Sequence, residues 1–300
     1  MGSMIQKIYE TAFDIWNSLI TVAMTLFNTS PLEASSGTLV SAISPVYTVL
    51  LDIGLITALL FFLIAIIKET MSAPPGQQIQ RMFLSAIRYG VILGILAKLW
   101  EIMKIIIQIT DYITSASAGT ADVSLSLADD AKTLITNYFT NTPDFDWLDI
   151  AGSIANWFTY AMMSILFFIL SIVTLFIVIA SVISIISSAF QRILKPLVIM
   201  PFGAIMVAAG AGTGDSERAM WSYLKTFIGF CLSGAVMVIC IRLGVTLCNG
   251  ISITGTVDVT STDTGVLTQS MLYLTVQTAV TPIVVAGLIK SVDSIIARFL

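Results

Sequence analysis

Residues 150–191 decide the fold of this chain, and they read IAGSIANWFTYAMMSILFFILSIVTLFIVIASVISIISSAFQ. The stretch has no charged side chain, no proline, and no glycine after Gly152. A membrane-spanning helix needs about 20 mostly apolar residues, because the hydrocarbon core of a bilayer is about 30 Å thick. The stretch is longer than that, so it is either one tilted helix that projects beyond the bilayer or two tightly joined helices. We favour one long helix, because no turn signal occurs between Ser153 and Ala189.

The composition of the whole chain agrees with this stretch. Of its 300 residues 57% are hydrophobic and 11% are charged, and the mean hydropathy is +0.96. Soluble domains do not reach these values. The sequence therefore predicts an all-α integral membrane protein with about five transmembrane helices; besides the one beginning near residue 151, they cover about 46–67, 82–107, 219–247 and 267–289.

The regions that flank these spans suggest the organisation of the chain. Apolar residues recur every three or four positions from Ile5 to Phe27, which predicts an N-terminal amphipathic helix that lies at the outer interface or packs against a neighbouring subunit or partner. We expect four regions: the amphipathic helix and outer segment at 1–38, a first transmembrane hairpin at 39–110, an acidic extracytoplasmic loop at 111–150, and a transmembrane core at 151–300.

The segment after the long stretch is apolar but interrupted. Residues 196–214 begin with PLVIMPFG, directly after Lys195, and end in a glycine-rich turn. We expect Pro196, Pro201 and Gly203 to break the helix. Basic residues lie on both sides of the segment, so a single crossing would place one basic pair on the wrong face. We therefore predict a re-entrant or short hairpin, shielded by protein neighbours, with these candidate subunit contacts: Pro196, Pro201, Gly203, Gly210, Gly212 and Gly214.

The distribution of Lys and Arg predicts the orientation. Eight of the 14 basic residues fall on one side if the N-terminus is outside and the C-terminus is cytoplasmic. The acidic loops at 111–149 and 249–264 then lie outside. We expect a multi-pass protein of the cytoplasmic (inner) membrane.

Charged residues inside the spans are the candidate functional residues, because charges in hydrocarbon are costly. Asp52, Lys98 and Arg242 each stand about 25 Å from the basic end of their span, which places them in one layer near the outer interface. Glu101 is a neighbour of Lys98 at i,i+3, and a pair between Asp52 and Lys98 is also possible. The layer either lines a hydrophilic passage or consists of snorkelling side chains with a local ion pair.

Catalysis and cofactor binding have little support in the sequence. The chain has no histidine, and its three cysteines lack metal-ligand spacing. The run from Gly210 to Ser216 lacks the lysine of a phosphate-binding loop. We expect a protein that is not an enzyme and that has no cofactor and no metal.

The block LKPLVIMPF at 194–202, the turn at Asp215–Glu217 and the sequence WSYLKTF at 221–227 are similar to those of TrbL-type membrane subunits of type IV secretion and conjugation systems. The similarity covers about 193–247, and elsewhere it is one of topology and hydropathy. It implies a homo-oligomeric channel or assembly subunit that helps to move single-stranded DNA with its relaxase, or protein, across the membrane. The implied partners are secretion ATPases, a bitopic scaffold and a pilin-like or surface subunit.

Two other functions remain open at this stage. A small-molecule or ion transporter would use the intramembrane charges to bind or gate its substrate. A membrane scaffold without a pore of its own would use the same spans only to assemble other subunits.

Overall fold

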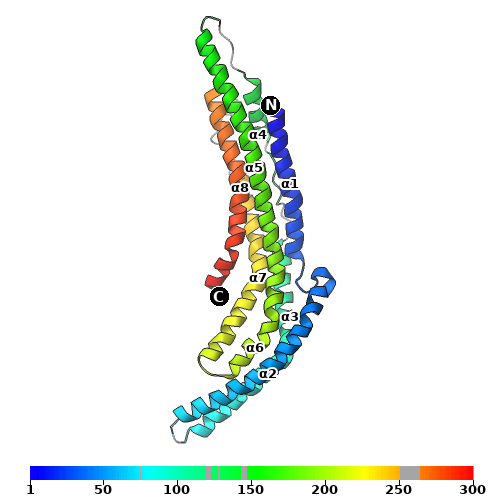
Figure 1. The fold of residues 1–300 in the computed structure, drawn as a ribbon, viewed down its shortest axis with the longest axis vertical. Helices are drawn as coiled ribbons and strands as arrows, with labels where there is room; N and C mark the ends of the chain where they lie inside the picture. Colours follow the sequence, from blue (N-terminus) through cyan, green and yellow to red (C-terminus); the bar gives the residue numbers. More distant parts are fainter. Residues whose placement is uncertain (75, 119–122, 128, 143–146, 251–263, 300) are drawn as a thin grey trace. The chain divides into compact units, whose positions relative to one another are not determined.

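The computed structural model describes residues 1–74, 76–118, 123–127, 129–142, 147–250 and 264–299. It is 91% helical, and no strand occurs in these ranges. The prediction of an all-α protein is confirmed. The helices, coloured along the chain in Figure 1, are α1 (Gly2–Asn28), η1 (Ala34–Gly37), α2 (Thr38–Ser72), α3 (Gln78–Ala118), α4 (Asp129–Thr140), α5 (Ile150–Ile199), η2 (Met200–Phe202), α6 (Gly203–Ala208), η3 (Ala209–Ala211), α7 (Asp215–Gly250) and α8 (Thr264–Phe299).

Four helical stretches in the described ranges are long and apolar enough to cross a membrane, rather than the five that we predicted. They are Thr38–Ser72, Ile150–Ala211, Asp215–Thr246 and Gly265–Val292. The predicted second span lies in α3, which is a helix but is not among the four. That helix carries four charged side chains between Arg88 and Lys104.

The 42 uncharged residues lie in a single helix, as we favoured. α5 has 50 residues, which corresponds to a length of about 75 Å, more than twice the thickness of a hydrocarbon core. Pro196 lies inside α5 and does not end it. The regular helix ends only at Ile199, one residue before the 3₁₀ turn that contains Pro201.

The chain divides into two compact units. Unit 1 consists of Met1–Thr25, Thr120–Ser188 and Ile239–Lys290, and unit 2 of Leu26–Gly119, Ala189–Val238 and Ser291–Leu300. Both units therefore draw segments from distant parts of the sequence, and each has its own buried residues.

In unit 1, the apolar stripe of α1 is buried within the chain itself. Tyr9 and Trp16 are at most 1% exposed, and the Tyr9 hydroxyl lies 3.0 Å from the Thr275 hydroxyl of α8. Asn17 forms two hydrogen bonds of 2.8 Å with the backbone of Leu125, one as donor and one as acceptor. The predicted amphipathic helix is confirmed, and its apolar face is covered by other parts of unit 1.

The acidic region at 111–150 contains more helix than we expected. α3 continues to Ala118, and α4 buries Ala131, Leu134, Ile135 and Tyr138 along one face. Asp129 and Asp130 occupy the first turn of α4, where the helix dipole favours negative charge. The second predicted outer loop, at 249–264, lies almost wholly outside the described residues.

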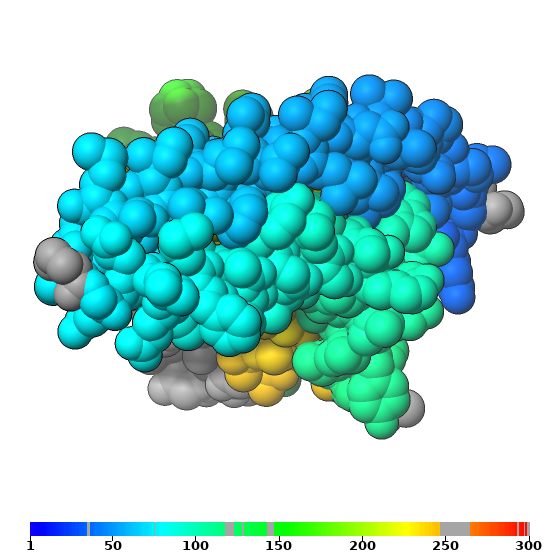
Figure 2. Space-filling view, turned by 90° about the horizontal axis from the view of Figure 1, so that it is seen from below, coloured from blue at the N-terminus to red at the C-terminus, as the bar shows by residue number. Residues whose placement is uncertain are grey.

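In unit 2, α2 and α3 form an antiparallel hairpin whose helices lie side by side (Figures 1 and 2). Tyr47 packs on Trp100 with ring centroids 4.6 Å apart, and Phe62 stacks on Tyr89 at 4.4 Å. α6 packs against both helices. It approaches α2 closely, because a Cβ atom on Gly54 would lie 2.8 Å from the carbonyl oxygen of Ala204.

Candidate functional site

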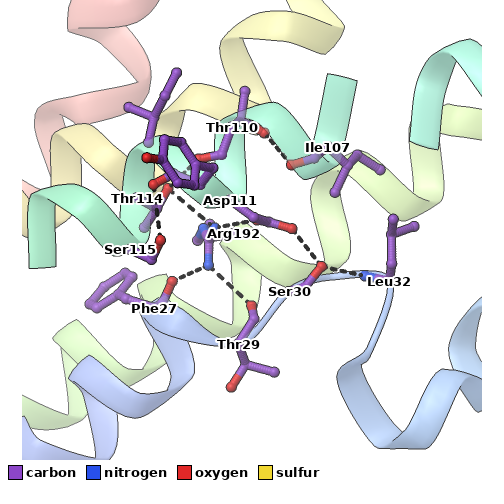
Figure 3. A network of polar contacts seen from close by, with 12 residues as sticks. Phe27, Thr29, Ser30, Leu32, Ile107, Thr110, Asp111, Thr114, Ser115 and Arg192 are labelled. Atoms are coloured by element: carbon purple, nitrogen blue, oxygen red, sulfur yellow. Dashed lines mark hydrogen bonds and ion pairs between the residues drawn. The ribbon is translucent and has the colours of Figure 1, made fainter. Parts of the chain in front are cut away.

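The most buried polar site of unit 2 is a network around Arg192, near the end of α5 (Figure 3). Arg192 Nη2 donates to Asp111 Oδ1 on α3 at 2.8 Å and to the Thr114 hydroxyl at 3.4 Å. Nη1 donates to the carbonyl oxygens of Phe27, the penultimate residue of α1, and Thr29, just beyond it. One guanidinium thus joins three segments of the chain.

Asp111 has a second partner within this network. The hydroxyl of Ser30 donates to Asp111 Oδ2 at 2.5 Å and accepts the backbone N–H of Leu32 at 3.2 Å. Asp111 lies beyond the predicted span at 82–107, and burial raises the pKa of its carboxyl group. The hydrogen bond from Ser30 and the positive charge of Arg192 oppose this shift and lower the pKa. Burial is the larger effect, so forming this ion pair has a desolvation cost.

The burial of Arg192 depends on a glycine of α7. The Arg192 side chain is 2% exposed, and its Nε atom has no hydrogen-bond partner in the part of the chain that the structure describes. A Cβ atom on Gly234 would clash with Arg192 Nε. Gly234 therefore leaves the space that the guanidinium occupies, and any larger residue there would displace it.

A second polar site lies near the other end of the unit 2 helices. Arg88 of α3 donates to the carbonyl oxygen of Gly212 at 3.2 Å and lies 3.9 Å from the Glu217 carboxylate of α7. Arg88 thereby holds the turn between η3 and α7, where Gly214 adopts a left-handed backbone conformation with φ of 71°.

These two sites show the path of the segment at 196–214. Four contacts join it to α3. In order along the segment they are Arg192 with Asp111, Gly203 with Met103, Gly210 with Ile92, and Gly212 with Arg88. The residue numbers of these α3 partners decrease as the residue numbers along the segment increase. The segment therefore runs antiparallel to α3 over about 35 Å, the rise of 23 helical residues.

This path corrects the predicted hairpin. Residues 193–211 continue α5 through η2, α6 and η3, and the chain reverses only at Gly212–Gly214. Arg192 and Arg218 are thus at opposite ends of the segment, and the side of a membrane on which each lies stays a prediction. Arg192 is buried against Asp111, so its charge is not that of an exposed loop residue.

The small residues of the segment make close contacts within the chain. Pro196, Pro201, Gly203, Gly210 and Gly212 are buried, and Gly214 is exposed. A Cβ atom on Gly203 would lie 2.7 Å from the Tyr223 hydroxyl, which itself donates to the carbonyl oxygen of Ile199 at 3.1 Å. The expected shielding by protein is found inside unit 2. Contacts of this segment with other subunits stay a prediction.

The predicted charged layer divides between the two units. Lys98 and Glu101 form the expected i,i+3 ion pair at 3.3 Å, and both side chains are about two-thirds exposed. Asp52 is exposed on α2 and forms no ion pair with Lys98 in the described part of the chain. Arg242 is half-buried and belongs to unit 1, whereas the other three belong to unit 2.

The sequence contained a signal for the Arg192 network that we did not use. Arg192 ends an uncharged run of 42 residues, and Asp111 follows the last apolar turns of the predicted second span. Two opposite charges at the ends of apolar helices need neutralisation, which favours a pair. The backbone carbonyl acceptors of Phe27 and Thr29 had no such signal.

Neither a search for metal-binding groups nor comparison with known proteins assigns a function to these two polar sites. Within the described ranges, no group of three or more His, Cys, Asp or Glu side chains is arranged to hold a metal ion. No family model, curated protein or solved structure matches the chain.

Proposed function

We propose that this protein is a channel or assembly subunit of an oligomeric machine in the cytoplasmic membrane, of the type IV secretion or conjugation class. One observation carries this proposal: unit 2 exposes a charged level, Lys98 with Glu101, in the middle of helices whose exposed side chains are otherwise mostly apolar. Such a face is unfavourable against lipid. A subunit that assembles with others, or that borders an aqueous passage, covers or hydrates it.

The assignment to secretion rests on the block at 194–202 and on 221–227, which are similar to TrbL-type subunits. In the structure these residues fall in the packed part of unit 2: Leu197, Met200 and Tyr223 are buried. A change there would disturb the position of α6 against α2 and α3. The resemblance thus concerns the residues that hold the charged hairpin in place.

Two measurements test the proposal. The mass of the protein in lipid nanodiscs should correspond to several copies. Deleting the gene in its host should abolish transfer of a mobilisable plasmid, while nicking of the plasmid by the relaxase stays at its normal level. A strictly monomeric protein would favour the transporter, and normal transfer from the deletion strain would exclude the role in conjugation.

A further inference from the structure

The two polar sites of unit 2 bound an apolar layer of about the thickness of a membrane. Arg88 and Asp111 are 23 residues apart on α3, which corresponds to about 35 Å, against about 30 Å for a hydrocarbon core. Between them α2 and α3 expose a series of large apolar side chains: Val49, Ile53, Ile56, Leu59, Leu60, Val91, Ile102 and Ile105. Lys98 lies ten residues from Arg88, and Glu101 lies ten residues from Asp111. The Lys98–Glu101 pair is therefore at the middle of this layer.

Asp52 lies at the same level on the neighbouring helix. The Phe62–Tyr89 stack fixes the register of α2 against α3. Measured from that stack, Asp52 is ten residues along α2 and Lys98 is nine residues along α3, or about 15 and 14 Å. The hairpin thus presents an exposed acid on one helix and an exposed base on the other at one depth.

These charges need a partner. A single charged side chain at the centre of a bilayer is unfavourable unless it is paired or hydrated. Lys98 has Glu101 on its own helix, with Lys104 three residues beyond, but the Lys98 and Glu101 side chains remain about two-thirds exposed, and Asp52 forms no ion pair in the described part of the chain. In a single chain, the exposed face of the α2–α3 hairpin therefore carries charge that no partner neutralises.

We propose that the missing partner is a second copy of this chain, with Asp52 on α2 of one copy paired to Lys98 on α3 of the next. Copies related by rotation about the membrane normal keep every residue at the same depth. The acid of α2 and the base of α3 therefore meet in a head-to-tail ring. Gly90 and Gly94, on the Lys98 face of α3, have open space where a Cβ atom would lie, which lets a helix of the next copy approach closely. The inference rests on the proposed function only in requiring a homo-oligomer.

Charge reversal tests the pairing. Asp52→Lys and Lys98→Asp should each lower the oligomeric fraction in nanodiscs at least tenfold, because each brings like charges together, and the double variant should restore it. Lys132→Asp serves as the matched control, because Lys132 forms an i,i+3 pair with Asp129 on α4, which belongs to unit 1. It should leave the oligomer unchanged.

Disulfide cross-linking separates pairing between copies from pairing within one chain. In a background with Cys231, Cys240 and Cys248 replaced by serine, one tagged copy carries Asp52→Cys and a differently tagged copy carries Lys98→Cys. Oxidation in membranes should link the two tags. Replacing the second cysteine by Lys132→Cys should abolish the link.

The outcomes distinguish this inference from the proposed function. A monomeric wild-type protein overturns both. An oligomer that tolerates the single reversals, or that the double reversal does not rescue, overturns the pairing alone. Cross-linking only in a chain that carries both cysteines also overturns it.

Discussion

At the scale of residues, Arg192 organises unit 2, because four polar groups from α1, α3 and the stretch after α1 converge on its guanidinium. Removing one member of a buried ion pair typically costs about 3–5 kcal/mol, since the other charge stays buried without compensation. The geometry of the Arg192 site depends as much on the absent side chain of Gly234 as on the groups that bind the arginine.

Gly234→Ala should destabilise the protein by about 1–3 kcal/mol, because the added methyl group enters the space of the Arg192 side chain. Thermal unfolding in detergent, followed by circular dichroism, measures this loss. Gly287→Ala is the matched control, since a Cβ atom on this α8 glycine meets nothing within 4 Å. The control should be neutral or slightly stabilising. Equal stability of the two variants would show that Arg192 is not confined as described.

At the scale of elements, the segment from Ile193 to Ala211 is an irregular continuation of α5 that follows α3 along its length. Pro201 allows the change from α-helix to 3₁₀ turn, and the buried alanines and glycines after it allow close packing on α2. The two ends of the segment are thus about 35 Å apart along α3.

Cysteine labelling tests this path in a background free of native cysteine. Glu33→Cys, close to the Arg192 network, and Asp215→Cys, at the first residue of α7, are both exposed sites. If unit 2 spans the bilayer, an impermeant maleimide should label them from opposite sides of sealed vesicles. Labelling of both from one side would restore the re-entrant hairpin.

Most elements were predictable from local pattern, and the site was not. The periodicity of α1, the uncharged run of α5 and the apolar stretches of α2, α7 and α8 each lie in one continuous stretch of sequence. The partners of Arg192 are 78 residues away or more, and two of them are backbone carbonyls, which are the same in every sequence. The helix α4 was missed because its four buried side chains lie in a strongly acidic region.

At the scale of the whole molecule, the chain builds two compact units, each with its own interior polar contacts. Unit 1 holds the Asn17–Leu125 and Tyr9–Thr275 hydrogen bonds, and unit 2 holds the networks of Arg192 and Arg88. The four regions that we predicted along the sequence do not coincide with these units, because each unit combines distant segments.

Hydrogen exchange should reveal this division. Arg192→Leu should raise amide exchange at least tenfold around 26–34 and 107–114, because it removes the bonds that fix these segments, and should leave 5–20 unchanged. Asn17→Ala is the reciprocal control, since it removes both bonds to Leu125 and should affect the backbone around that residue. Mass spectrometry of the protein in detergent reads both patterns. Uniform loss of protection in either variant would contradict independent interiors.

The Arg192 network also sets an order of events during synthesis. Phe27, Ser30 and Asp111 all leave the ribosome before Arg192, which follows Asp111 by 81 residues. At about 5–20 residues per second, Asp111 is present for about 4–16 s before its arginine exists. The acceptors are therefore synthesised before the arginine that binds them. Until then the Asp111 carboxylate must stay in water or be held by the insertion machinery, so the N-terminal half of unit 2 cannot finish packing before α5 is complete.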